Sequence, residues 1–573
     1  MTIYASFLSR GYFPKELPPA FYTEGFSHFA RTAAGRAALT SYKPTDSFTD
    51  CVSYRLAQPS LDGLATRPLR IPHPFAYAKL AGIVAKNFRR LLTKVGASPF
   101  SKSRPVYGTD LDRALRTLIH PSRLSRERAL SRAGATHLLK ADISQFYPSL
   151  YTHAVGWAVD PKLRERKHWN NRKLLGKQLD QALMDLQGKV SQGLPIGPDL
   201  SFLLAEAVLG QVDRSLKLPK GMTYRWFDDY EIACTSRQAA EQTLARLAKL
   251  LDTYKLRLNP EKTKILELPM TAGDAWQDEL LSLSKHSLST PAGVVAYFDH
   301  ALRLKVTYPA SPVLMYAVGV LFRLLKPPRA VHRVAQSYIL QAIVSEPGCA
   351  QKVFALLTFW EINGAPFDRD LAAQTIENLA RLHQSRGLSS DLAWALSFAI
   401  LHGLTLTKPV GIVTSQFDDD AIAIEALDAN ARGLLPGFDL RRLERALTNE
   451  GCEGTHWLVL YEGVRQGFLK TLEKTVRSDK LFEAMLAAKV AFYRQDLPPY
   501  APLIHPGGAP EWVVRAWLKG LSREARASRP DAVTADIAKL SNRKKLSADD
   551  ILHALLLRYS VLPTGAIEPY GPS

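Results

Sequence analysis

Apolar spacing divides the chain into a mixed part and a helical part. Between residues 66 and 285, stretches with helical spacing alternate with short runs typical of strands. The predicted helices are 76–92 and 177–186, and the predicted strands are 136–142, 224–227 and 230–234. This alternation predicts an α+β domain.

The last part of the chain, residues 286–573, has almost no strand signal. Amphipathic helices follow one another there, with apolar residues near i, i+3, i+4 and i+7. Examples are residues 331–344, 371–382, 421–429 and 480–493. The pattern predicts an all-helical, helical-repeat-like domain, although no clean repeat of about 34 or 40 residues is present.

The first 65 residues carry Pro14, Pro18, Pro19 and Pro44 among short aromatic clusters and show no sustained period. Such a segment predicts an irregular N-terminal extension draped over a neighbouring domain. The expected organisation is therefore an extension at 1–65, an α+β domain at 66–285 and a helical domain at 286–573.

Composition excludes several classes of protein. Hydrophobic residues make up 46% of the 573 residues, which excludes an intrinsically disordered chain. The four cysteines form no CxxC pair, which argues against a disulfide framework or a zinc site and indicates buried thiols. The N-terminus lacks the apolar region of a signal peptide, and no apolar run reaches the roughly 20 residues of a membrane span. We expect a cytoplasmic protein.

Basic charge points to a polyanionic partner. The chain has 74 Lys and Arg against 54 Asp and Glu, a net charge of +20. Half of this surplus lies in residues 86–140, and a second basic cluster follows at 162–177. An ordinary solvated helix face would explain one such run. Two runs on either side of one acidic strand favour a nucleic-acid channel.

Three aspartates carry the strongest chemical signal. Asp228 and Asp229 are adjacent and have strand-forming residues on both sides, while Asp142 ends an apolar strand 86 residues upstream. Adjacent carboxylates repel each other unless a divalent cation compensates them. Three carboxylates on neighbouring strands can hold two Mg²⁺ ions, so the predicted reaction is in-line nucleotidyl transfer.

Two further segments are candidate parts of this site. A Gly/Pro loop at residues 192–198 leads into a helix that begins near Asp199. The loop is either an ordinary turn, with Asp199 as the N-cap of the helix, or a segment whose backbone comes close to a bound nucleotide. Lys262 follows a turn and is either a surface residue or a donor to the departing pyrophosphate.

In chain order these segments resemble motifs A, B, C and D of reverse transcriptases. The four motifs are Asp142 to Tyr147, Gly193 to Gly197, Trp226 to Asp229, and Leu258 to Thr263. The runs Phe146 to Trp157 and Leu194 to Asp199, together with the opening Arg10 to Pro19, resemble more narrowly the bacterial antiphage branch, the abortive-infection (AbiK-like) and defence-associated enzymes. The resemblance implies fingers and an antiparallel palm sheet, with the helical domain in place of a thumb.

The resemblance also implies residue roles. Asp142, Asp228 and Asp229 match the catalytic metal-binding aspartates, with the Ile143 carbonyl as a further ligand. Lys262 matches the motif D lysine and is a further catalytic residue. The other positions match nucleotide-binding groups, with Tyr147 as the steric gate that prefers deoxynucleotides; the remaining members are Phe146, Gly193, Pro195, Gly197, Arg67 and Arg70.

Members of this branch make DNA in phage defence, and the resemblance carries that expectation over. Their synthesis is primed from a protein hydroxyl without a template in some members and proceeds on a partner noncoding RNA in others. The implied partners are dNTPs, nucleic acid and further copies of the chain in a trimer or hexamer, and the implied cofactor is Mg²⁺ or Mn²⁺. Ile196 stands where retroelement enzymes have a motif B glutamine, which puts ordinary templated copying in doubt.

Two other functions stay open at this stage. The chain could be a non-catalytic nucleic-acid-binding scaffold with a relic palm, or an RNA-templated enzyme of the retroelement type. A second acidic run, Asp418 to Asp420, is read as the start of a helix and not as another metal site, because acids favour helix N-termini.

Overall fold

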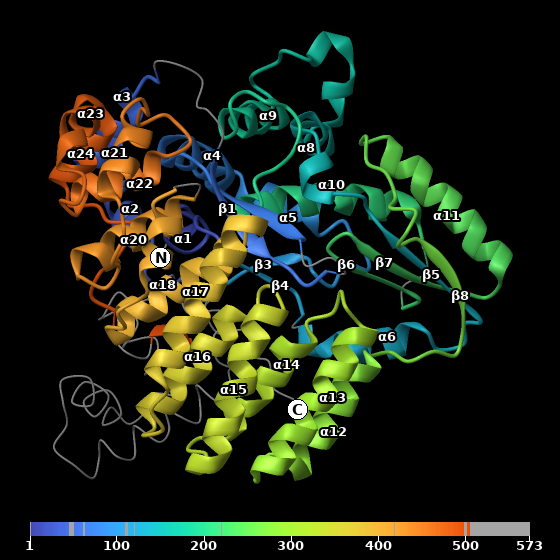
Figure 1. The fold of residues 1–573 in the computed structure, drawn as a ribbon. Helices are drawn as coiled ribbons and strands as arrows, with labels where there is room; N and C mark the ends of the chain where they lie inside the picture. The colour runs from blue at the N-terminus through green and yellow to red at the C-terminus, as the bar shows by residue number, and fades with distance from the viewer. Residues whose placement is uncertain are drawn as a thin grey trace, which may run out of the picture.

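The computed structural model describes residues 2–44, 51–60, 64–108, 113–119, 121–218, 221–416, 419–497 and 501–504. Figure 1 shows a sheet with its helices on one side of the molecule and a succession of helices on the other. The four cysteines, all within the described residues, are buried, and no disulfide joins them, as expected from the sequence. Within these residues, no helix combines the length and the apolar composition that crossing a bilayer requires.

The central sheet has four antiparallel strands in the order β6-β7-β5-β8. Their bounds are β5 (His137–Asp142), β6 (Thr223–Trp226), β7 (Asp229–Cys234) and β8 (Lys264–Glu267). The three strands predicted from the sequence are confirmed, and β8 adds an edge strand to β5. Strand β5 lies between two neighbours, and its apolar residues Leu138, Leu139 and Ala141 are buried.

Helix α10 (Asp199–Leu216) is the core of this part of the chain. It packs against α5, α8 and α11, and 15 of its 18 residues are buried. A helix surrounded on all sides has no wide polar face to expose, which explains why most of its residues are apolar. The helices of this region are α4 (Pro74–Lys86), α5 (Phe88–Val95), α6 (Leu124–Ser131), α7 (Phe146–Ser149), α8 (Thr152–Val159), α9 (Leu175–Asp185) and α11 (Arg237–Asp252).

Two of these helices were predicted from spacing alone. Helix α9 agrees with the predicted 177–186, whereas the predicted single helix 76–92 is two helices that meet at Asn87. The Asn87 backbone leaves the helical region, with φ −113° and ψ 14°, so the chain changes direction there. Apolar spacing continues across the break because both helices bury a face in the same core.

The N-terminal segment is not the irregular extension that its prolines predict. It forms α1 (Ile3–Arg10), α2 (Glu24–Phe29), α3 (Ala33–Ser41) and β1 (Val52–Ala57), and β1 pairs with β2 (Thr66–Ile71). Helices of six to nine residues are too short to show a period. Tertiary burial forms them instead: Tyr12 stacks on Tyr77 with ring centroids 4.1 Å apart, and both rings are fully buried.

The described part of residues 286–504 is all-helical, as predicted. Helices two apart in the chain pack on each other, for example α13 on α15, α14 on α16 and α16 on α18. This is the packing of stacked helix pairs, visible as the yellow and orange rows in Figure 1. The helices are α12 (Ala275–Ser287), α13 (Pro291–Thr307), α14 (Val313–Val320), α15 (Arg329–Ser345), α16 (Ala350–Ile362), α17 (Arg369–Arg386), α18 (Ser389–His402), α19 (Lys408–Thr414), α20 (Asp420–Ala431), α21 (Leu440–Leu447), α22 (Trp457–Arg465), α23 (Glu473–Ser478), α24 (Lys480–Ala487) and α25 (Ala501–Ile504).

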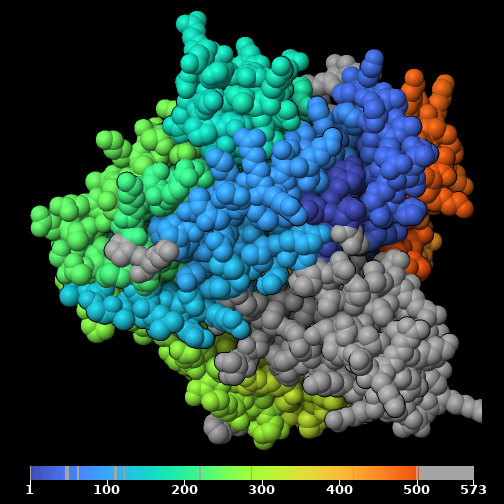
Figure 2. Space-filling view, turned by 180° about the vertical axis from the view of Figure 1, so that it is seen from behind, coloured from blue at the N-terminus to red at the C-terminus, as the bar shows by residue number. Residues whose placement is uncertain are grey.

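One predicted helix of this region, 480–493, ends early. Helix α24 stops at Ala487, and the chain beyond it runs in extended form beside the N-terminal segment. The N–H of Tyr22 donates to the carbonyl of Phe492 at 3.0 Å, and the N–H of Arg494 donates to that of Ala20 at 2.9 Å. Figure 2 shows the blue N-terminal residues beside the orange ones. These long-range backbone bonds replace the helical bonds that local spacing predicts.

The burial of Glu425, on α20, can be tested through the pH dependence of the protein's stability. Its side chain is fully buried, and its pKa is raised well above the usual range by burial, with Asp428 and Asp419 nearby. The folded state therefore keeps the proton that the unfolded state releases above about pH 4.5, so the free energy of unfolding falls as pH rises from there. We expect Glu425→Gln to remove this slope, which is at most about 1.4 kcal/mol for each pH unit, and so to raise the free energy of unfolding at pH 8.

Urea denaturation at pH 5 and pH 8 measures this effect. The two proteins should be alike near pH 5 and differ at pH 8. Glu473→Gln, at an exposed helix position, is the matched control and should leave the slope unchanged. A Glu425→Gln protein with the wild-type slope would contradict the assignment.

Candidate active site

Three carboxylates meet at one end of the central sheet. Asp142 is the last residue of β5 and Asp229 the first of β7, and the two stand opposite each other in the antiparallel register. Asp228 occupies the turn between β6 and β7, where Phe227 takes the left-handed conformation with φ 51°. A two-residue turn with positive φ suits the twist of a hairpin. The structure thus brings together the three aspartates that the sequence singled out.

The negative charge of this cluster is only partly compensated. Lys262 Nζ lies 3.2 Å from Asp142 Oδ2. Desolvation raises the pKa of Asp228, and the charge of Asp142 adds to the shift. The pKa of Asp229 rises to about 7 because of desolvation, repulsion by Asp228 and a hydrogen bond with Asp142. A cation other than Lys262 would relieve this repulsion.

The donor set fits a hard divalent cation. Carboxylate oxygens, with a backbone carbonyl such as that of Ile143, are the ligands that Mg²⁺ prefers. Ile143 is buried and pairs with Leu258, which leads to Lys262. Among the described residues, no group of three His, Cys, Asp or Glu side chains stands in metal-binding positions, and Asp142 faces Lys262. The fit therefore rests on the donor chemistry.

Tyr147 lies beside this cluster. Gln145 takes a left-handed turn with φ 44°, and the chain then enters α7 with Phe146 and Tyr147, whose ring centroids are 5.3 Å apart. Burial raises the pKa of Tyr147, and the charge of Asp228 contributes. The structure thus places Tyr147, the predicted steric gate, close enough to Asp228 for the charge of that carboxylate to act on the Tyr147 hydroxyl.

The loop at residues 192–198 docks against α7 through its backbone. The N–H of Leu194 donates to the Tyr147 carbonyl at 2.9 Å. Gly193 and Gly197 have φ values of 93° and 124°, which residues with a Cβ rarely adopt. At Gly197 a Cβ would lie 2.6 Å from Pro14 Cγ, so this glycine is also required by close packing. Pro195 is buried within the same loop.

Strand β2 brings the two predicted arginines to the site in different ways. Arg67 is exposed, and its charge lowers the pKa of Asp228 and of Tyr147, so its guanidinium lies within electrostatic reach of both. The backbone N–H of Arg70 donates to the Ile196 carbonyl at 2.8 Å, which ties β2 to the loop.

Residues 79–287 match the family model described as reverse transcriptase (RNA-dependent DNA polymerase). They form a reverse transcriptase domain. The match contains Asp142, Asp228, Asp229 and Lys262, and the enzyme class of the domain is RNA-directed DNA polymerase. Reverse transcriptase domains use divalent metal ions, typically Mg²⁺. The sheet with its helices and the helical region after it agree with the fold class expected from the sequence.

Solved telomerase structures are also similar to the chain. Apo telomerase from Candida tropicalis has 10% identity and a TM-score of 0.29, with 66% of this chain and 71% of that chain covered. Telomerase from Candida albicans in complex with a TWJ fragment of telomeric RNA has 12% identity and a TM-score of 0.26, with 66% and 64% covered. No curated protein sequence matches the chain.

Asp199 does not cap helix α10 of the reverse transcriptase domain. Pro198 precedes the helix, and the Asp199 carboxylate instead accepts hydrogen bonds from Arg113 Nε at 2.8 Å and from the N–H of Leu115 at 3.0 Å. Arg113 also donates to the carbonyls of Phe13 and Gly197. The N-cap reading of the sequence was wrong because a buried arginine, distant in the chain, uses this carboxylate.

A buried ion network beside the turn between β6 and β7 was missed by the sequence reasoning. Arg225 is fully buried and donates to Glu206 Oε1 at 2.8 Å, to Asp213 Oδ2 at 2.8 Å and to the Phe227 carbonyl at 2.6 Å. The N–H of Phe227 donates to Ser103 Oγ at 2.7 Å. The network therefore holds both the N–H and the carbonyl of Phe227, the residue before Asp228. Glu206 and Asp213, two acids seven positions apart on a mostly apolar helix, were the available signal.

The basic residues of 86–140 divide into two groups. Several form ion pairs inside the molecule, which explains part of the local surplus without a nucleic-acid ligand. These are Arg90 with Asp160, Lys102 with Glu127, Arg113 with Asp199, and Arg128 and Arg132 with Glu231. Others, such as Lys86, Arg89, Arg116, Arg123 and Arg126, are exposed. Asp110 and Asp112 lie outside the described residues.

The second acidic run belongs to a helix start, as the sequence predicts. Asp419 caps α20, and its Oδ1 accepts the N–H of Ala421 at 3.0 Å. Asp420 Oδ1 lies 2.7 Å from His456 Nδ1. Phe417 and Asp418 lie outside the described residues.

Proposed function

We propose that the chain is a two-metal nucleotidyltransferase that makes DNA from dNTPs in antiphage defence. The observation that carries this proposal is the pairing of Asp142 with Asp229 beside the turn that holds Asp228, within a reverse transcriptase domain. The defence role rests on the resemblance of the segments around Tyr147 and Gly197 to the antiphage branch.

In this mechanism Asp142, Asp228, Asp229 and the Ile143 carbonyl would hold the divalent ions. When bound, the ions would supply positive charge to the phosphates and lower the pKa of the attacking hydroxyl. Lys262 stands beside Asp142, where its ammonium can stabilise or protonate the leaving pyrophosphate. Arg67 brings a cation to the same side for the triphosphate. The left-handed glycines of the loop allow its backbone to approach the incoming nucleotide closely.

The loop also bears on how a template is used. Ile196 is half-buried, and its carbonyl is held by Arg70. An isoleucine side chain offers no hydrogen bond to a template base, which supports synthesis with relaxed templating. We propose that synthesis is primed by a protein hydroxyl and needs no template, and that the protein acts as a homo-oligomer. A bound noncoding RNA is the other outcome of the test below.

Incorporation of radiolabelled dNTPs by the purified full-length protein tests the proposal. The reactions contain Mg²⁺ or Mn²⁺ and either no template, an RNA template with primer, or the nucleic acid that co-purifies. Label that enters the protein band and is removed by both nuclease and protease indicates a protein-linked product. No incorporation under any of these conditions contradicts the proposed activity and favours a non-catalytic scaffold.

Tyr147 should set the choice of sugar. We expect Tyr147→Ala to reduce discrimination between dNTPs and rNTPs by about 100-fold, because removal of the ring opens space for a 2′-hydroxyl. The ratio of kcat/KM for the two nucleotides measures this effect. Tyr147→Phe keeps the ring and should retain discrimination. Equal discrimination in wild type and Tyr147→Ala would rule out the gate.

A further inference from the structure

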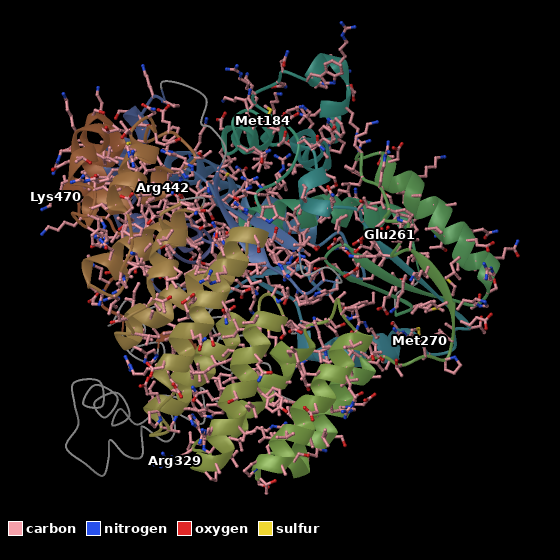
Figure 3. All side chains as sticks on the ribbon, in the orientation of Figure 1. Met184, Glu261, Met270, Arg329, Arg442 and Lys470 are labelled. Atoms are coloured by element: carbon pink, nitrogen blue, oxygen red, sulfur yellow. The ribbon has the colours of Figure 1, made fainter. Side chains whose placement is uncertain are left out.

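The segment between α8 and α9 forms a basic surface with a cavity. It contains the short helices η2 (Pro161–Arg164) and η3 (Arg166–His168) and projects at the top of Figure 1, next to α9, where Met184 is labelled in Figure 3. The cavity measures about 560 Å³. Its lining includes His153, Trp157, Arg164, Trp169, Lys177 and Lys255, and we call it the tryptophan pocket.

Trp169 presents an unused ring to solvent. Its exposed fraction is 54%, and of the tryptophans in the described ranges it alone is exposed. No aromatic or cation contact to its ring occurs within that part of the chain, whereas Trp157 has Arg164 over its face. Exposing an indole loses the free energy of burying it, so a binding role explains its position better than packing does.

Cations line the pocket together with this ring, and others lie in the same segment. The guanidinium carbon of Arg164 lies 5.4 Å from the ring centroid of Trp157 and 4.7 Å from that of Tyr254, so two aromatic faces hold it. Further exposed cations come from the same segment, and Glu165 opposes them but pairs with Lys167 at 3.0 Å. These cations are Lys162, Arg166, Lys167, Arg172 and Lys173.

The pocket is close to the catalytic cluster along the chain. Lys255 precedes Leu258 by three residues, so their Cα atoms are within about 11 Å of each other. Leu258 pairs with Ile143, the neighbour of Asp142. A strand that leaves the active site could therefore reach the pocket within a few nucleotides.

We propose that the tryptophan pocket binds single-stranded nucleic acid, with a base stacked on Trp169 and phosphates held by Arg164 and Lys255. Lys177 also lines the pocket, but its Nζ pairs with Oδ2 of Asp180, an acid of the same lining, at 3.2 Å. An exposed aromatic face among cations is the arrangement that recognises unpaired bases on a phosphate backbone. A duplex keeps its bases stacked on each other, so it would not use the ring. Binding at this surface needs neither metal ions nor nucleotide addition, and it goes beyond the proposed polymerase function.

Fluorescence anisotropy with the full-length protein tests this site. The probes are fluorescein-labelled dT20, rU20 and a DNA duplex of the same length, in EDTA and without nucleotides. We expect Trp169→Ala to weaken single-strand binding about tenfold, within the range for loss of one stacked base. Trp169→Phe should stay within about threefold of wild type, and duplex binding should not change. Circular dichroism checks that the variants are folded.

Charge removal gives the second comparison. Arg164→Gln should weaken binding of the single strands and Lys474→Gln, at an exposed lysine of α23, should not. Tighter binding of dT20 would assign the pocket to DNA and tighter binding of rU20 to RNA, and either result supports it. Wild-type affinity of Trp169→Ala for both strands, or an equal loss for the duplex, overturns the proposal. Because no synthesis is measured, these outcomes are separate from a failure of the polymerase activity.

Discussion

Asp228→Asn is expected to lower nucleotide incorporation by at least about 1,000-fold. The amide replaces a carboxylate that the proposed divalent ions require. Asp142→Asn should have a similar effect and also removes the partner of Lys262. The rate of dNTP incorporation at saturating Mg²⁺ measures both.

Stability separates this loss of function from a loss of fold. The carboxylates repel one another, as the raised pKa values of Asp228 and Asp229 indicate, so neutral variants should melt at the same or a higher temperature without divalent ions. Added Mg²⁺ should raise the Tm of the wild type and leave Asp228→Asn unchanged.

Glu261→Gln is the matched control for the aspartate variants. Glu261 is an exposed acid in the turn before Lys262, labelled in Figure 3, and its loss should leave activity within about twofold. An active Asp228→Asn protein would refute the metal-binding role and support the scaffold alternative.

Arg225→Met should destabilise the domain by about 3–5 kcal/mol, because it leaves the buried carboxylates of Glu206 and Asp213 without their cation. Chemical denaturation measures the change. Since Arg225 also holds the Phe227 carbonyl, dNTP incorporation should fall even where the variant is fully folded.

Arg237→Gln provides the matched control for Arg225. It breaks an exposed pair with Glu241 and should cost less than about 1 kcal/mol. The triple variant Arg225→Met, Glu206→Gln, Asp213→Asn should recover part of the stability, because the unpaired charges are then removed. If Arg225→Met lowers the free energy of unfolding by no more than Arg237→Gln does, the stabilising role of the buried ion network is contradicted.

Local pattern was enough for the strands and for the aspartates. Alternation and apolar runs identified β5, β6 and β7, and the acids at their ends had to meet once the strands paired antiparallel. The long helices α15, α17 and α20 were predicted for the same reason, because their apolar positions repeat over several turns.

Non-local contacts explain what was missed. Helices α1 to α3 are too short to show a period and form where aromatic residues such as Tyr12 are buried against distant elements. Arg113 takes Asp199 away from its expected cap, and the pairing of Phe492 with Tyr22 ends a predicted helix. None of these partners lies within one helical turn of the residue it affects.

The order of the elements and the identity of the three aspartates can be inferred from residues that are neighbours along the chain. Which charges compensate each other depends instead on how the elements pack. Arg225 lies 12 residues from Asp213 and Arg113 lies 86 residues from Asp199. A buried charge must have its counter-charge within contact distance, and that condition is satisfied by the packing of whole elements, which no local pattern records.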